Sequence, residues 1–211
     1  MTGVTGMTGK PGKPEYRSRR LILKDWGSEE EVMQFGAEGG WEVLVDEASD
    51  IRQGIVRNVI WRVAPGLVLQ YAVDSRSHCS AFVLIGSPED SVQRLQESIE
   101  RNLQPWTLKE LVAAVDKAER AQGAEELYRA VLRAGIGAPR GFDKKFFTCI
   151  RRAILGNDPR LRSAGIWATA YSRWPEFLPL LTDVARQDPV DSLRRDAQII
   201  LDHYNDEQGR P

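Results

Sequence analysis

The sequence predicts an α+β N-terminal domain, a mainly antiparallel sheet with two helices, followed by an all-α solenoid of three helix pairs. Between residues 19 and 104, short runs rich in β-branched and aromatic residues alternate with turn sequences. Between residues 105 and 205, apolar residues instead fall at helical spacing, and a pattern recurs at spacings of 34 and 33 residues. Residues 1–18 and 206–211 have the composition of a disordered leader and tail.

The first domain begins with an expected short strand at residues 20–23 and a helix that Ser28 caps. Three glutamates, Glu29 to Glu31, lie in the first turn of this helix, where the helix dipole favours negative charge, and Gly39-Gly40 ends it. Further strands are expected at residues 41–45, 55–63, 67–73 and 81–85. A second helix follows Ser87-Pro88, with an apolar stripe of Val92, Leu95, Ile99 and Leu103.

The second half begins with Thr107, which together with Glu110 has the spacing of a capping box. Glycines and two Asp-Pro pairs separate the helices that follow. We expect these helices at residues 124–134, 143–155, 160–171, 175–186 and 192–204. With the Thr107 helix they make three pairs.

Two sets of residues at equivalent positions of the three units, which we call columns, define the repeat. Ala130, Ala164 and Ala197 form one column, and Leu111, Phe146 and Leu180 form a second column ahead of it. A small residue at a fixed position of each unit allows two helices to approach closely, so we expect the alanines to be buried. A fixed period of this length indicates a stacked helical solenoid.

The last two units resemble HEAT repeats. Their second helices follow Asp-Pro and carry an arginine two residues before the small alanine, with Asp158, Arg162 and Ala164 in one unit and Asp188, Arg195 and Ala197 in the other. The resemblance extends over residues 107–204 and is weaker in the first unit, which lacks Asp-Pro. It implies polar ladders between neighbouring units, made by the Asp and the Arg, and a scaffolding or binding role.

Composition excludes several classes of protein. Cys79 and Cys149 lie 70 residues apart, which provides neither a disulfide framework nor a metal-binding pair. No apolar run is long enough for a membrane helix, and the first residues lack the apolar core of a secretory signal. We therefore expect a cytoplasmic protein that makes no contact with membranes.

The one candidate for a catalytic site is the polar loop from Asp74 to Cys79, which includes Ser77 and His78. Catalytic triads bring their members together from distant segments, and neighbours on an extended chain point in opposite directions. We interpret the loop as a polar turn before a core strand. His203 has no second ligand at metal spacing, and no phosphate-binding glycine loop occurs. We expect no catalytic residues, no metal and no cofactor.

Six tryptophans divide into two groups. Trp41, Trp61 and Trp167 lie in apolar stripes and are expected in the core. Trp26, Trp106 and Trp174 lie at element boundaries, where a ring can seal a repeat or anchor a partner. We expect sealing.

Charge is distributed unevenly along the chain, although the net charge is −1. Residues 25–100 carry fourteen acids against five arginines, whereas residues 121–175 carry ten basic residues against four acids. The resemblance to HEAT repeats implies that the second helices line the binding face, and on these helices lie Arg129, Arg133, Arg160 and Arg194.

These features favour a non-enzymatic protein-protein interaction module that binds a protein partner on this face. One version is an immunity-type protein, whose acidic first domain covers a basic partner. The alternative is a nucleic-acid-binding or base-excision protein that uses the basic repeats, as HEAT-like DNA glycosylases do.

Overall fold

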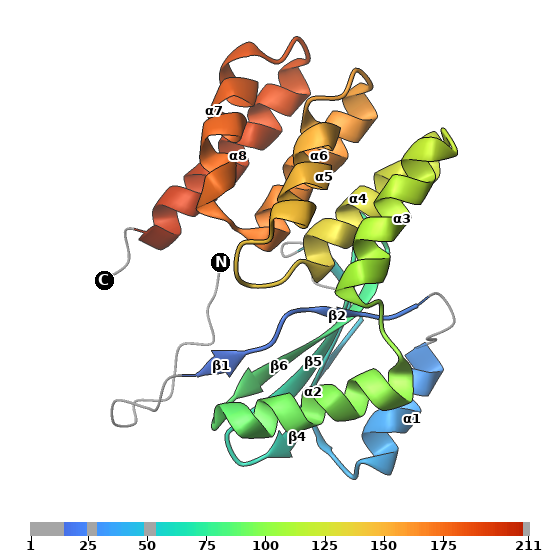
Figure 1. The fold of residues 1–211 in the computed structure, drawn as a ribbon. Helices are drawn as coiled ribbons and strands as arrows, with labels where there is room; N and C mark the ends of the chain where they lie inside the picture. The colour runs from blue at the N-terminus through green and yellow to red at the C-terminus, as the bar shows by residue number, and fades with distance from the viewer. Residues whose placement is uncertain (1–14, 25–28, 49–53, 209–211) are drawn as a thin grey trace. The chain divides into compact units, whose positions relative to one another are not determined.

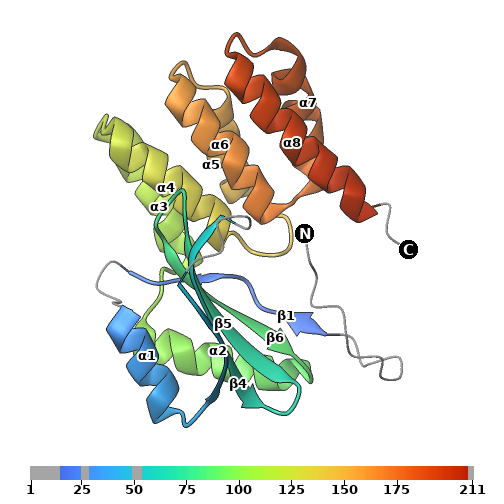
Figure 2. The same cartoon turned by 180° about the vertical axis from the view of Figure 1, so that it is seen from behind.

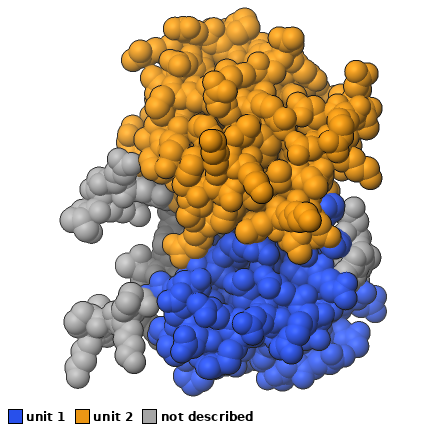
Figure 3. Space-filling view, viewed as in Figure 1, with its two compact units in different colours: residues 1–106 blue, residues 107–211 orange. Residues whose placement is uncertain are grey.

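The computed structural model describes residues 15–24, 29–48 and 54–208. The chain divides into two compact units, Met1–Trp106 and Thr107–Pro211, which are coloured blue and orange in Figure 3. Each unit has its own core, and the division lies next to the boundary at residue 104 that the sequence predicts. The predicted fold class, an antiparallel α+β unit followed by a series of helices, is confirmed.

The first unit contains a six-stranded antiparallel sheet in the order β1-β6-β5-β4-β3, with β2 also paired to β6. The strands are β1 (Tyr16–Arg17), β2 (Leu21–Ile22), β3 (Glu42–Glu47), β4 (Ile55–Ala64), β5 (Leu67–Asp74) and β6 (Ser80–Gly86). The leader prediction is wrong for residues 15–18, because β1 pairs with β6 and Ser18 is buried. A strand of two residues has no periodicity that a sequence pattern can reveal.

Helices α1 (Glu29–Glu38) and α2 (Glu89–Leu103) lie on the same face of the sheet (Figure 2). Val32 of α1 and Val92 and Ile99 of α2 share one core with alternate residues of the central strands. The strand residues in this core include Val59, Trp61, Leu69, Tyr71, Phe82 and Leu84. The alternation seen in the sequence therefore identifies the covered face of the sheet.

The second unit consists of three helix pairs (Figure 1). The pairs are α3 (Leu108–Arg120) with α4 (Ala124–Gly137), α5 (Lys144–Ile154) with α6 (Pro159–Ser172), and α7 (Leu178–Gln187) with α8 (Asp191–Gln208). A short 3-10 helix, η2 (Pro175–Phe177), precedes α7. The second helices α4, α6 and α8 contact one another in sequence and form one layer. The tail prediction is wrong for residues 206–208, which continue α8.

The alanine column is confirmed, because Ala130, Ala164 and Ala197 are all buried. In the second column Leu111 and Phe146 are buried, but Leu180 is only half-buried and its neighbour Leu181 is fully covered. The 3-10 turn before α7 changes the helical phase, so the apolar position moves by one residue.

Glycines bring the helices of this unit together. A Cβ atom on Gly135 of α4 would lie 2.5 Å from the Cα of Ala168 in α6. A Cβ on Gly165 of α6 would lie 2.7 Å from Cγ1 of Ile154 in α5. Gly165 therefore marks the side of α6 that faces the first-helix layer, and residues on the opposite side of α6 face away from that layer.

Candidate functional site

The candidate site is the face of α4, α6 and α8 that points away from α3, α5 and α7. We call it the second-helix surface. It includes Glu125, Tyr128, Arg129, Arg160, Trp167, Arg195 and Ile199. Arg160 and Trp167 lie two helical turns apart on the side of α6 opposite Gly165, and Arg195 and Ile199 lie one turn apart on α8.

One end of this surface is organised around the carboxylate of Glu125. The Nε of Arg129 donates to one Glu125 oxygen at 3.2 Å, and the Nη2 of Arg160 donates to the other at 2.7 Å. The guanidinium of Arg160 also lies 6.0 Å from the ring centroid of Tyr128. A guanidinium over a ring face is a favourable cation–π contact. The cluster therefore joins α4 of the first helix pair to α6 of the second pair.

The other end is organised around Trp167. Its indole N–H donates to Asp196 of α8 at 3.2 Å, which joins α6 to α8. Trp167 is half-buried, so its predicted place in the core is only partly correct. Beside it on α8, Ile199 is 45% exposed. The side chain of Arg195 is exposed and makes no hydrogen bond or ion pair with any other described residue.

The structure brings two of the four predicted binding arginines together and separates the other two. Arg129 and Arg160 are exposed and share Glu125. The predicted exposure of Arg133 is wrong, because Arg133 is only 7% exposed, with Nη1 3.9 Å from Glu126. Helical spacing places Arg133 on the same side as Arg129, but residues 130–137 of α4 are buried on every side of the helix.

Arg194 stabilises a loop instead of facing a partner. It is half-buried and donates to the backbone carbonyl of Asp188 at 2.6 Å and to the carboxylate of Asp191 at 2.5 Å. These bonds hold the turn that leads into α8. Arg194 therefore belongs to the structural polar contacts of the repeat.

A polar ladder joins α6 to the loop before α8. Arg162 donates two hydrogen bonds to Asp188, at 2.8 Å and 3.0 Å. Burial by itself raises the pKa of Asp188, but the hydrogen bonds from Arg162 and from the backbone N–H of Val190, with the charges of Arg162 and Arg194, outweigh it and lower this pKa. The predicted contact of Arg162 is confirmed.

The corresponding prediction for Arg195 is wrong. Arg194 takes the position in α8 that Arg162 takes in α6. The backbone N–H of Arg162 donates to the carbonyl of Asp158 at the start of α6, and the backbone N–H of Arg194 donates to the carbonyl of Val190 at the start of α8. The loop after Asp188 is longer than the loop after Asp158, and this difference moves the ladder arginine by one residue relative to the alanine column.

The Asp74–Cys79 loop is a hydrogen-bonded turn. One Asp74 oxygen accepts from the backbone N–H groups of Arg76 and Ser77 and from the Ser77 hydroxyl, at 3.1, 2.7 and 2.8 Å. The Ser77 hydroxyl oxygen in turn accepts the N–H of Cys79 at 3.1 Å. His78 is exposed, with a positive φ of 54°. The polar groups thus satisfy one another in the manner of an Asx-turn.

Trp174 seals the repeat, as its position between elements predicts. It is buried, stacks on Phe177 and donates its indole N–H to the carbonyl of Arg140 at 3.2 Å. Trp61 is in the core as expected, whereas Trp41 and Trp106 are half-buried. Trp26 lies outside the described residues.

Metal-binding clusters and membrane-spanning helices are absent from the described residues. No group of three or more His, Cys, Asp or Glu side chains in residues 15–24, 29–48 and 54–208 could hold a metal ion. None of the helices in these ranges combines the length and the apolar composition of a membrane span. No protein-family model, curated protein or solved structure matches the chain.

Proposed function

We propose that this chain is a non-enzymatic, cytoplasmic interaction module and that a protein partner binds the second-helix surface. The observation that carries the proposal is the convergence of Arg129, Arg160 and Tyr128 around Glu125 on a surface that also presents Trp167 and Ile199. Tyr, Trp and Arg are the residues that contribute most binding energy at protein interfaces. The resemblance to HEAT repeats points to the same use of the second helices.

Charge pairing favours a protein over a nucleic acid as the partner. Arg129 and Arg160 share Glu125, Arg152 pairs with Asp116 and Glu119, and Arg162 pairs with Asp188, so carboxylates already neutralise much of the basic excess in this unit. Binding to nucleic acid draws its affinity mainly from arginines and lysines that neutralise phosphates. Paired arginines remain suited to a protein interface, where they pack as planar groups.

The turn formed by Asp74, Ser77 and Cys79 supports the non-enzymatic part of the proposal. A nucleophile needs a base in hydrogen-bond reach and a third group that orients the base. Here the Ser77 hydroxyl donates to Asp74. Among the described residues the imidazole of His78 makes no hydrogen bond to the Cys79 thiol, whose sulfur instead lies 3.8 Å from the carbonyl of Ser77. These groups build the turn.

The test is affinity capture with the full chain as bait, from cells of the host in which the protein occurs, followed by mass spectrometry. The informative variant is the double reversal Arg129→Glu/Arg160→Glu, which removes both contacts to Glu125 and inverts the charge of the surface. The matched control is Arg186→Glu, an exposed arginine on α7 in the first-helix layer. Circular dichroism checks that each variant is folded.

We expect one protein to be captured by the wild type and by the Arg186 variant and to be lost with the double reversal. Equal capture by all three proteins would reject the second-helix surface. Co-purifying nucleic acid, seen as a raised ratio of absorbance at 260 to 280 nm, would favour the nucleic-acid alternative instead.

A further inference from the structure

One exposed face of helix α5 belongs neither to the core of the second unit nor to the second-helix surface. The opposite face of α5 is buried through Phe146, Cys149, Ile150, Ala153 and Ile154. The exposed face carries Lys144, Thr148, Arg151 and, at its C-cap, Leu155, at spacings of four, three and four residues. These positions lie on one side of a helix. Together with Phe142, which precedes the helix, they form what we call the α5 stripe.

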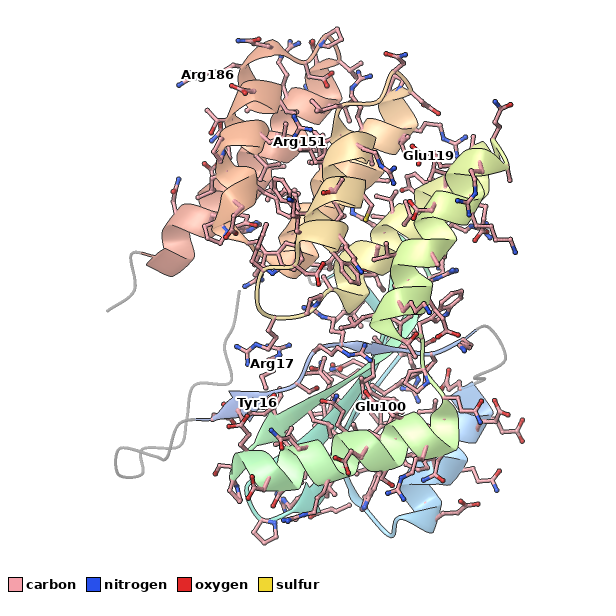
Figure 4. The ribbon with its side chains drawn as sticks, in the orientation of Figure 1. Tyr16, Arg17, Glu100, Glu119, Arg151 and Arg186 are labelled. Atoms are coloured by element: carbon pink, nitrogen blue, oxygen red, sulfur yellow. The ribbon has the colours of Figure 1, made fainter. Side chains whose placement is uncertain are left out.

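The cations of the α5 stripe lack compensating acids. No Asp or Glu occurs in α5, and Asp143, just before it, caps the helix by accepting from the N–H groups of Lys145 and Phe146. The side chains of Lys144, Lys145 and Arg151 make no hydrogen bond or ion pair with any other described residue. Arg152, on the side toward α3, contrasts with them because Asp116 and Glu119 pair with it. Arg151 is labelled in Figure 4.

Two large apolar side chains lie at the ends of the stripe. Phe142 is 48% exposed and Leu155 is 54% exposed. The Phe142 ring is held in place, since it packs against Phe147 with ring centroids 5.5 Å apart and against Trp174 at the same distance. An exposed ring that is already ordered loses little entropy when it binds, which is the property of an interface anchor.

We propose that the α5 stripe binds an acidic, amphipathic segment of a partner protein, with apolar residues of that segment on Phe142 and Leu155 and its carboxylates on Lys144 and Arg151. This second binding surface is separate from the proposed function, because α5 belongs to the first-helix layer. Uncompensated cations between two exposed apolar groups are complementary to a segment that has acids between two apolar residues. From Phe142 to Leu155 the stripe extends over roughly 20 Å at the helical rise, so a segment of about four turns covers it.

A nucleic acid fits this stripe less well. Phosphates would contact the lysines and Arg151, but the exposed Leu155 gains nothing from a sugar-phosphate backbone. The two cations of the stripe, together with the neighbouring Lys145, are also fewer than the roughly six to ten phosphate contacts that a DNA-binding surface makes.

The experiment uses the 15N-labelled full chain and three probes. The first is a helical peptide of four turns with glutamates between two leucines, the second has lysines in place of the glutamates, and the third is a single-stranded DNA oligonucleotide. Chemical-shift titration detects even weak binding and locates it through the amides of Thr148 and Arg151. The charge variant is Lys144→Glu/Arg151→Glu, and the apolar variant is Phe142→Ser/Leu155→Ser. The matched control is Lys109→Glu, an exposed lysine on α3 outside the stripe.

We expect the acidic peptide alone to shift the Thr148 and Arg151 amides. The charge variant should raise the dissociation constant of the acidic peptide by about tenfold, and the apolar variant by a comparable factor, while the Lys109 variant binds like the wild type. The proposal is overturned if no shifts occur at α5, if the lysine peptide binds equally well, or if the oligonucleotide binds and the apolar variant leaves that binding unchanged. None of these results bears on the capture experiment with Arg129 and Arg160, so the two proposals fail separately.

Discussion

Arg162 holds Asp188 through two parallel hydrogen bonds, from Nε at 2.8 Å and from Nη2 at 3.0 Å. The two side chains are 11% and 4% exposed. The same guanidinium also donates to the backbone carbonyls of Gly156 and Asn157, at 3.3 and 3.0 Å. One arginine therefore joins the turn before α6 to the turn before α8, and its charge is satisfied on both sides.

Removing the acid of this pair should be costly. We expect Asp188→Ala to lower the free energy of unfolding by about 3 kcal/mol, because it leaves the buried Arg162 without its counter-charge. The control Asp158→Ala removes only an exposed N-cap that accepts from Arg160, and should cost about 1 kcal/mol. Urea unfolding followed by circular dichroism measures both. Similar losses for the two variants would show that the pair contributes no more than a cap.

The same pair predicts a dependence on pH. The pKa of Asp188 is lower in the folded chain than its ordinary value of 3.8. The stabilisation that ionised Asp188 provides is therefore fully present at pH values above its ordinary pKa. It is lost as the pH falls through the lowered pKa of the folded chain, because the unfolded chain binds the proton more readily than the folded chain does. Asp188→Asn should be less stable than the wild type at neutral pH, with the difference shrinking as the pH falls below about 4. A difference that stays constant with pH would contradict the lowered pKa.

Gly135 should not tolerate a methyl group. Alanine usually stabilises a helix relative to glycine by up to about 1 kcal/mol. At residue 135, however, a Cβ would lie 2.5 Å from the Cα and 2.6 Å from the Cβ of Ala168. We therefore expect Gly135→Ala to lower the melting temperature, whereas the control Gly141→Ala, where a Cβ has open space, leaves it unchanged or raises it. A stabilised Gly135→Ala variant would show that α4 and α6 can separate without cost.

A larger side chain in the alanine column should overpack the second unit. Ala164 is completely buried, so Ala164→Leu is expected to cost roughly 1 to 3 kcal/mol. Ala113 is exposed on α3, and Ala113→Leu provides the control for the same change in size. Thermal unfolding of the two variants tests the register of the repeat, since equal stability would mean that residue 164 has room beside it.

The Asp74 turn should depend on its carboxylate and not on its imidazole. Asp74→Ala removes an acceptor of three hydrogen bonds, and each contributes roughly 0.5 to 1.5 kcal/mol or more. His78→Ala changes an exposed side chain and should alter stability by no more than about 0.5 kcal/mol. Chemical denaturation ranks the two variants. A larger loss for His78→Ala would require a role for the imidazole beyond this turn.

The sequence by itself determined the local features of this protein. Thr107 and Glu110 form the capping box that their spacing predicts, and Asp143 and Asp158 cap α5 and α6. The alanine column is buried where the 34-residue period places it. Capping, helical periodicity and strand alternation depend on neighbours within a few residues, so a single chain displays them directly.

Contacts between distant segments were decided only by the tertiary structure. Strand β1 forms because β6 offers it an edge, Arg133 is buried although Arg129 one turn earlier is exposed, and Arg194 takes the ladder position that the alanine column assigns to Arg195. The convergence of Arg129 and Arg160 on Glu125 joins residues 35 positions apart. Whether a charged side chain meets a carboxylate, water or a packed helix depends on which elements surround it, and periodicity reports only the side of its own helix on which it lies.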